Sequence, residues 1–354
     1  MSKSVALLLV LVFLAASCLI VATPAFSSAS EAENTWATKA PMHQARAGLG
    51  VAAVNGKIYA IGGKTENGIV STNEEYDPAT NTWVFREPIP TPRESFAIAA
   101  YQNKIYCIDQ SANEVYNPAT DSWETKASMP MANSASQAIV VGDKIYLISS
   151  SSNLVYEPAT NSWTEKTPPQ YSISPSGSAV IEDRIYFLSA PRELSDVWTG
   201  AFIQVYDAIN DSWSTGPNWP ISGYKEWLST AGATSRVAAP ERIYFFDDTK
   251  TLSYDPVNGS WTLGASMPTA RLSVGVCVID DTFYVIGGST EGQETTILRH
   301  PSPLNEQYTP FGYGTIPPEP EPEAFPTALV IAASVACVVL VGAGLIVYFK
   351  KRKH

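Results

Sequence analysis

Histidine and cysteine, the side chains that most often bind transition metals, are scarce in this chain. Its 354 residues include 3 His and 4 Cys, without a CxxC pair. Cys18 and Cys337 lie in apolar runs near the two ends, whereas Cys107 and Cys277 are far apart in the central region. We therefore expect no metal centre, no cofactor and no disulfide framework, with Cys107 and Cys277 as buried free thiols.

Positive charge is also in short supply. The chain has 23 Lys and Arg against 34 Asp and Glu, a formal net charge of −11. Five of the 23 basic residues lie at the two ends, so the region between the terminal apolar runs carries 18 basic against 34 acidic groups, a formal balance of −16. A protein that binds nucleic acid needs a basic surface for the phosphates, so this acidic balance argues against nucleic acid as a partner.

Catalytic motifs and long helical patterns are missing as well. The sequence has no Ser/His/Asp arrangement, no glycine-rich phosphate loop and no paired-carboxylate motif, so binding is more expected than catalysis. No apolar heptad pattern runs between residues 30 and 320, whereas aromatic residues, Gly and Pro are frequent. This composition favours an all-β domain over a helical one.

The sequence does contain a tandem repeat. A tyrosine and a tryptophan seven residues apart flank a turn, first in Tyr76-Asp77-Pro78-Ala79-Thr80-Asn81-Thr82-Trp83. A pair such as Ile58-Tyr59, after a two-residue turn such as Asn55-Gly56, precedes each copy. The later copies begin and end at Tyr116 and Trp123, Tyr156 and Trp163, Tyr206 and Trp213, and Tyr254 and Trp261. The unit is roughly 40 to 50 residues long, a length typical of β-propellers.

The two ends of the repeat region complete each other. Residues 34–36, Asn-Thr-Trp, match residues 81–83, and residues 305–310 match residues 73–78, although the last unit has no tryptophan of its own. We therefore expect residues 34–40 to pair beside residues 304–309 and to close a ring of six four-stranded units. Radial packing protects the edges of such sheets. The predicted fold class is an all-β, six-bladed β-propeller, with a linear β-array as the alternative.

These marks resemble those of the kelch-repeat β-propellers. Gly62-Gly63 and Gly287-Gly288 follow the second strand of the first and last units, and the Tyr and Trp keep the family's spacing over residues 34–310. The four middle units replace the glycine pair, which permits positive φ and close backbone approach, so their inner strands are expected to differ. Copper oxidases related to galactose oxidase share the kelch architecture, but this sequence offers no matching set of ligands.

Both ends of the chain are predicted to contain segments that direct it to a membrane or span one. Residues 1–25 are typical of a secretory signal peptide, with an uncleaved anchor or a lipidated Cys18 as alternatives. A propeller at 31–311 is followed by a Pro/Glu-rich linker at 312–325, one transmembrane helix at 326–349 and a basic cytoplasmic tail at 350–354. The propeller is then extracellular on a single-pass cell-membrane protein. This arrangement resembles the anchors of prokaryotic, especially archaeal, cell-surface proteins.

Three arginines form the first candidate site. Arg46, Arg93 and Arg271 stand at the start of a unit's first strand, where they are predicted to project toward the mouth of the central channel and to bind a carboxylate. The sialic-acid mutarotases are secreted six-bladed kelch proteins, so the resemblance implies a carboxylated sugar as one ligand. The alternative is that these arginines pair with neighbouring loops, and Asn133 replaces the arginine in the third unit.

Aromatic residues outside the repeat form the second candidate site. Trp198 lies between the predicted second and third strands of unit four, and Trp219, Tyr224 and Trp227 lie in the connection to unit five. Both kinds of connection emerge on the same face of a propeller, so these rings are predicted to form a ligand platform. Packing of the two loops against each other is the alternative.

The predicted function is a cell-surface kelch propeller that binds an extracellular protein or a glycan. The alternative is a carbohydrate-active enzyme similar to the sialic-acid mutarotases, which would convert a sugar rather than only retain it. Asn210 and Asn258 begin glycosylation sequons in predicted turns, where modification would fit an exported domain.

Overall fold

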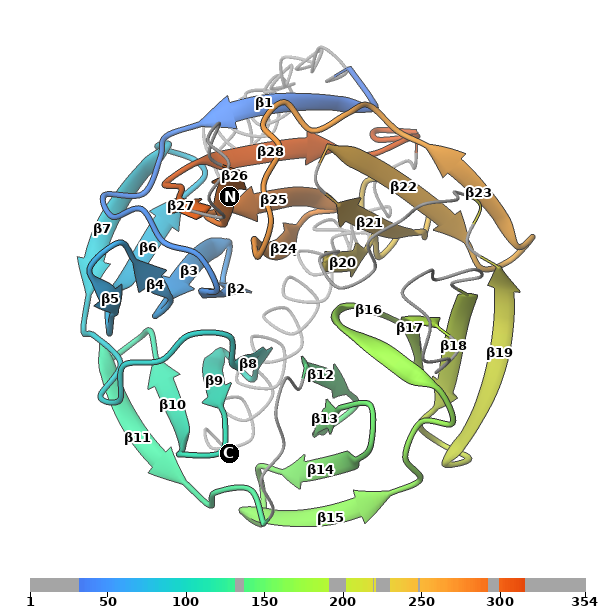
Figure 1. Cartoon of the computed structure of the whole chain (residues 1–354), viewed down its shortest axis with the longest axis horizontal. Coiled ribbons are helices and arrows are strands. Elements are labelled where there is room, and N and C mark those ends of the chain that lie inside the picture. Colours follow the sequence, from blue (N-terminus) through green and yellow to red (C-terminus); the bar gives the residue numbers. More distant parts are fainter. Residues whose placement is uncertain are drawn as a thin grey trace, which may run out of the picture. The chain divides into compact units, whose positions relative to one another are not determined.

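The computed structural model describes residues 32–130, 137–190, 202–218, 220, 230–247, 249–291 and 299–315. Within these residues the strands form six four-stranded antiparallel sheets, arranged around a central axis like the blades of a propeller (Figure 1). The predicted all-β, six-bladed β-propeller is therefore confirmed.

Each blade has its first strand innermost and its fourth strand at the rim. Blade 1 contains β2 (Gly50–Val54), β3 (Lys57–Ile61), β6 (Asn73–Asp77) and β7 (Thr82–Arg86). Blade 2 contains β8 (Ala97–Tyr101), β9 (Lys104–Ile108), β10 (Asn113–Asn117) and β11 (Ser122–Lys126). Blade 3 contains β12 (Gln137–Val141), β13 (Lys144–Ile148), β14 (Asn153–Glu157) and β15 (Ser162–Lys166).

The second half of the ring follows the same order. Blade 4 contains β16 (Ser172–Ile181), β17 (Arg184–Ala190), β18 (Phe202–Asp207) and β19 (Ser212–Asn218). Blade 5 contains β20 (Thr230–Ala233), β21 (Ile243–Asp247), β22 (Lys250–Asp255) and β23 (Ser260–Leu263). Blade 6 contains β24 (Gly275–Ile279), β25 (Thr282–Ile286), β28 (Asn305–Thr309) and β1 (Thr35–Lys39). Two short ribbons are made by β4 (Lys64–Thr65) with β5 (Gly68–Ile69), and by β26 (Ser289–Glu291) with β27 (Arg299–Pro301).

Two-residue turns set the register within the blades. Asn55 and Gly56 link β2 to β3 with φ angles of 51° and 71°, the left-handed conformations of the hairpin that Asn-Gly favours. Val54 pairs with Lys57 across this turn. The second strands β3 and β9 are buried along nearly their whole length, because neighbouring blades cover both faces. Burial on both sides explains their continuous apolar runs.

Strand β1 closes the ring as the outer strand of blade 6. It pairs antiparallel with β28, so that Thr35 lies opposite Thr309 and Lys39 lies opposite Asn305. The predicted closure by residues 34–40 beside residues 304–309 is therefore confirmed. Trp36 lies opposite Tyr308, and the first repeat tryptophan thus completes the unit that has none of its own.

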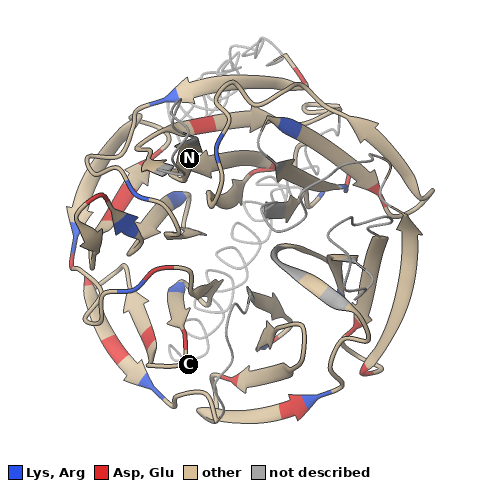
Figure 2. Ribbon diagram, in the orientation of Figure 1, with Lys and Arg blue, Asp and Glu red and all other residues tan. Residues whose placement is uncertain are grey.

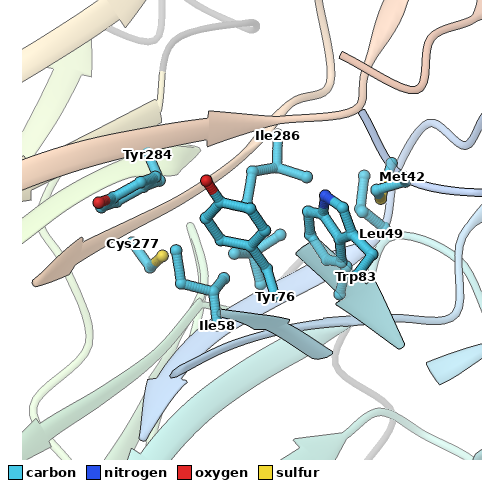
Figure 3. Close-up of a cluster of buried hydrophobic side chains, with 10 residues drawn as sticks. Met42, Leu49, Ile58, Tyr76, Trp83, Cys277, Tyr284 and Ile286 are labelled. Atoms are coloured by element: carbon cyan, nitrogen blue, oxygen red, sulfur yellow. The ribbon is translucent and has the colours of Figure 1, made fainter. Parts of the chain in front are cut away.

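The hydrophobic core is divided among the interfaces between neighbouring blades. Figure 3 shows the interface of blades 6 and 1, where Tyr76 and Trp83 pack in one cluster with Tyr284 and Cys277. Cys107 is buried between blades 1 and 2. Both cysteines are free thiols, as predicted. Burial raises the pKa of each thiol, which keeps it protonated and unreactive.

Hydrogen bonds between blades explain the fixed spacing of the repeat Tyr and Trp. The Tyr76 hydroxyl donates to Asn81 Oδ1 (2.7 Å), which also accepts the backbone N–H of Ala40 (2.8 Å). The Trp83 indole N–H donates to the Ala40 carbonyl (2.8 Å). Ala40 directly follows the outer strand of blade 6, so one turn of blade 1 holds the end of the preceding blade. We call such a pair of hydrogen bonds a blade clasp: a turn residue accepts the N–H of the residue that follows the preceding blade, and the repeat tryptophan donates to the carbonyl of that same residue.

The glycine pair of blade 1 allows the next blade to approach. Gly62 has a φ of 60°, and a Cβ at this position would stand 2.6 Å from the carbonyl oxygen of Arg93. That carbonyl accepts the N–H of Gly63 at 2.8 Å. Glycine is therefore required here for both conformation and space. Among the described residues, β-ribbons follow the two glycine pairs, while the blades without a pair keep the same four-stranded meander.

Several predicted segments lie outside the described residues, namely the signal peptide at 1–25, the linker beyond residue 315, the helix at 326–349 and the tail at 350–354. The part of the chain that is described has no helix long and apolar enough to cross a bilayer. The first residues of the predicted linker are described and contact blade 5: the Gly314 N–H donates to the Ala238 carbonyl at 2.7 Å.

Candidate functional site

The strand order gives the propeller two unlike faces. The turn face carries the turns after each first strand and those between third and fourth strands. The opposite, loop face carries the connections between second and third strands and those between blades. Strand β28 ends and β1 begins at the turn face, where Thr309 lies opposite Thr35. Both ends of the described propeller therefore leave from the turn face.

The two β-ribbons lie on the loop face of blades 1 and 6. Strand β4 pairs with β5 and β26 pairs with β27. His300 Nδ1 of one ribbon lies 3.2 Å from Glu66 Oε1 of the other. Both side chains are more than half exposed, so this contact joins the ribbons weakly. Ile69, at the end of the blade 1 ribbon, is 50% exposed.

Arg46 lies inside blade 1. Its side chain is fully buried, and its guanidinium group pairs with Glu74 Oε1 at 2.9 Å. It also donates to the carbonyls of Gly62 (2.8 Å), Thr72 (2.9 Å) and Ala60 (3.1 Å). Burial lowers the pKa of Arg46 to about 10, although the Glu74 carboxylate opposes this shift. The group remains charged at neutral pH and ties the end of β3 to the start of β6.

Arg93 and Arg271 repeat this arrangement in blades 2 and 6. Arg93 pairs with Glu114, and Arg271 lies 2.7 Å from Glu306 Oε2. The two arginine side chains are 3% and 0% exposed, and burial lowers the pKa of Arg271 despite its carboxylate partner. These positions favour the alternative in which the repeat arginines pair within their own blades. Their role in binding a ligand stays a prediction.

The three carboxylate partners were not anticipated from the sequence. Glu74, Glu114 and Glu306 each occupy the second position of a blade's third strand, two residues before the repeat tyrosine. The signal was nevertheless present. The units that have the arginine also have this glutamate, whereas the third unit has Asn133 in place of the arginine and Leu154 in place of the glutamate.

His43 gives the blade 1 pair an extra partner. In blades 2 and 6, the hydroxyls of Thr91 and Thr269 donate to the second carboxylate oxygen at 2.8 and 2.9 Å. In blade 1 that oxygen belongs to Glu74 and lies 2.8 Å from both the backbone N and the ring Nδ1 of His43. The imidazole also stacks on Phe85, with ring centroids 4.8 Å apart. Phe85 is 61% exposed, so the rim of blade 1 presents an aromatic pair.

The residues of the second candidate site lie outside the described part of the chain. These residues are Trp198, Trp219, Tyr224 and Trp227. The flanking strands nevertheless define where both connections begin and end. Successive strands of each blade are antiparallel. Strand β17 therefore ends and β18 begins at the loop face, and β19 likewise ends and β20 begins there. The two long connections are thus anchored on the same face.

The sequon asparagines lie in exposed turns on the turn face of blades 4 and 5. Asn210 Nδ2 donates to Asp207 Oδ2 at 3.0 Å, and Asn258 Nδ2 donates to Asp255 Oδ2 at 2.9 Å. An amide that carries a glycan keeps one N–H, so these hydrogen bonds are compatible with modification. Glycosylation of Asn210 and Asn258 stays a prediction.

Charged residues are spread around the ring (Figure 2). Among the described residues, no group of three or more His, Cys, Asp or Glu is placed to hold a metal ion.

Comparisons with known proteins agree with this architecture. The Kelch motif matches residues 45–88, which cover blade 1 and the segment that leads into it. An 85-residue segment is 33% identical to an F-box/kelch-repeat protein of Arabidopsis thaliana, and this match covers 23% of the chain and 21% of the Arabidopsis protein. The match thus spans about a fifth of that relative's length.

The solved structure of YjhT is similar over most of the propeller. The two share a TM-score of 0.58 at 14% sequence identity, over 74% of this chain and 95% of the YjhT chain. At this identity the similarity concerns the fold. The chain is thus a six-bladed β-propeller that contains a Kelch motif.

Proposed function

We propose that this chain is a cell-surface binding module that uses the loop face of its propeller to retain an extracellular protein or glycan. The observation that carries the proposal is the separation of the two faces. Both ends of the described propeller leave from the turn face, so a membrane anchor joined to residue 315 would hold the loop face outward. The loop face is then the surface open to a partner.

Within the loop face, the proposed binding site is the rim of blades 4 and 5, with Trp198, Trp219, Tyr224 and Trp227 as contact residues. Blades 2, 3 and 5 have short connections between their second and third strands, such as Asp109–Ala112 between β9 and β10. The connections at this rim hold three tryptophans outside the repeat. Flat aromatic side chains with polar neighbours suit both a sugar and a protein loop.

The burial of Arg46, Arg93 and Arg271 weighs against a carboxylate clamp and hence against the mutarotase-like alternative. A ligand would have to displace Glu74, Glu114 or Glu306 from its partner, and leaving a charge buried without a partner is costly. The described contacts therefore favour a binding site other than these three arginines.

The test is a screen of the full-length chain against glycans and cell-envelope extracts, with sugar turnover followed by NMR. Trp219→Ala and Trp227→Ala are expected to abolish retention and to shift the melting temperature little. Trp163→Ala is the matched control, because this repeat tryptophan donates to the Ala127 carbonyl at 2.9 Å inside a blade interface. Rim variants that unfold as readily as the control, or a sugar that is converted, would contradict the proposal.

A further inference from the structure

Five of the six blade boundaries have a complete blade clasp in the described residues. An Asn or Asp side chain accepts the N–H of the residue that leaves the preceding blade, at 2.6–3.0 Å. The repeat Trp donates to the carbonyl of that same residue, at 2.8–2.9 Å. The acceptors are Asn34, Asn81, Asp121, Asn161 and Asp211, and the residues that they hold are Ala265, Ala40, Glu87, Ala127 and Thr167.

At the boundary of blades 4 and 5, both participants in the first bond have changed. Each held residue stands four positions after a repeat tryptophan, and four positions after Trp213 stands Pro217, which has no N–H to donate. Each acceptor stands two positions before the next tryptophan, and two positions before Trp261 stands Gly259, which has no side chain. The five acceptors have φ angles between 48° and 54°, and Gly259 has a φ of 71°. The left-handed turn is thus kept and only the hydrogen-bonding group is lost.

Another hydrogen bond is missing on the blade 4 side. In blades 1, 2 and 3, an asparagine three positions before the repeat tyrosine donates to the carbonyl of the held residue at 3.1–3.2 Å. These asparagines are Asn73, Asn113 and Asn153. The corresponding residue of blade 4 is Ile203, whose side chain has no donor. This asparagine bond lies within one blade, and blade 5 also lacks the amide, with Thr251 at the corresponding position. The loss specific to the boundary of blades 4 and 5 is therefore the clasp bond to a backbone N–H.

Apolar packing at this boundary is intact. Tyr186 and Leu188 of blade 4 lie in one buried cluster with Phe245 and Tyr254 of blade 5. Apolar contact has no preferred direction, whereas a hydrogen bond weakens steeply when its distance or angle changes. The two blades therefore stay together. In the described residues, a hinge or sliding motion between them does not have to break the clasp bond to a backbone N–H that the other five boundaries have.

We propose that the ring opens first between blades 4 and 5, and not at the strand closure in blade 6. Blade 6 is secured by the full β1–β28 pairing and by a clasp on each side. The two long connections of the loop face begin and end beside the proposed opening. Movement there would change the distance between the end of β19 in blade 4 and the start of β20 in blade 5. This inference rests on the described hydrogen bonds and does not depend on the identity of a ligand.

Hydrogen–deuterium exchange of the full-length chain tests the proposal. We expect amides of β19 and β23, at the boundary of blades 4 and 5, to exchange faster than amides of β11 and β15, at the boundary of blades 2 and 3. The double variant Pro217→Ala/Gly259→Asn restores donor and acceptor, and it should slow exchange in β19 and β23 about fivefold, the effect of one typical hydrogen bond. Gly142→Asn is the matched control, since Gly142 also has positive φ (59°) and its added Cβ meets no atom within 4 Å.

The reverse variant, Asn161→Gly, removes the acceptor at the boundary of blades 2 and 3. Because Asn161 Oδ1 also accepts the Tyr156 hydroxyl at 2.7 Å, we expect exchange in β11 and β15 to rise at least about fivefold, toward the rate of β19 and β23. Equal exchange at the two boundaries of the unmodified chain would overturn the proposal, as would an unchanged rate in the double variant. If the double variant does not fold, Asn161→Gly decides: faster exchange supports the proposal and an unchanged rate overturns it.

Discussion

Replacing Glu74 by Gln removes one charge of the buried Arg46–Glu74 pair with almost no change in size. Both side chains are 0% exposed, so the variant leaves the Arg46 guanidinium buried without its counter-charge. Removal of one partner of a buried ion pair costs about 3 to 5 kcal/mol. Three backbone carbonyls still accept hydrogen bonds from Arg46, and we therefore expect a loss near the lower end, about 3 kcal/mol.

The assay is urea unfolding of the full-length chain, followed by tryptophan fluorescence. Glu157→Gln is the matched control, because it weakens the partly exposed Lys144–Glu157 pair, whose charged atoms are 3.4 Å apart. Such pairs contribute at most about 1 kcal/mol. If Glu74→Gln is no more destabilising than the control, the Arg46–Glu74 pair does not stabilise blade 1, and ligand binding becomes the better explanation of Arg46.

Three further predictions concern the clasps, the closure and the topology. The pKa values of Asp121 and Asp211 lie below the usual range of an aspartate. Partial burial raises each pKa, but hydrogen bonds from a tyrosine hydroxyl and a backbone N–H outweigh this effect. These two carboxylates stabilise the fold above their unfolded pKa of about 4 and lose this contribution as pH falls through the lower folded pKa. With Asn at both positions, the urea midpoint is expected to fall less between about pH 5 and pH 2, and an unchanged pH dependence would count against the clasps. Deleting residues 31–42 removes β1 and should unfold the whole ring in circular dichroism, whereas a truncated chain that melts at the same temperature as the full chain contradicts the closure. Protease added to intact cells should release the propeller by cutting within residues 312–324, and protection of that segment on an otherwise accessible surface argues against an extracellular propeller.

Much of the fold could be predicted because the repeat records local geometry. Asn55-Gly56 specifies a hairpin through the conformations that these two residues adopt easily. The match of Asn34-Thr35-Trp36 to residues 81–83 revealed that the first strand belongs to the last blade. Tyr76 and Trp83 gave the strand spacing, since both lie on neighbouring strands of one hairpin and pair with each other.

The partners of the repeat residues could not be predicted in the same way, because they depend on contacts between distant segments. Asn81 accepts a hydrogen bond from Ala40, 41 residues earlier, and nothing local to either residue indicates this contact. Arg46 was predicted at the start of the first strand of blade 1, but it lies four residues before β2, and the direction of its long side chain was not predicted. The side chain of Arg46 points toward Glu74, 28 residues later. This carboxylate offsets the cost of burying the guanidinium group, but only when β6 lies beside β3.

Protection of amides by a bound partner tests the central claim, a binding loop face, most directly. The measurement is hydrogen–deuterium exchange of the full-length chain with and without a glycan or envelope protein that the screen retains. We predict slower exchange in peptides that span residues 191–201 and 219–229, and no change in the turns at residues 77–82 and 117–122 on the turn face. Protection confined to the turn-face peptides would contradict the claim.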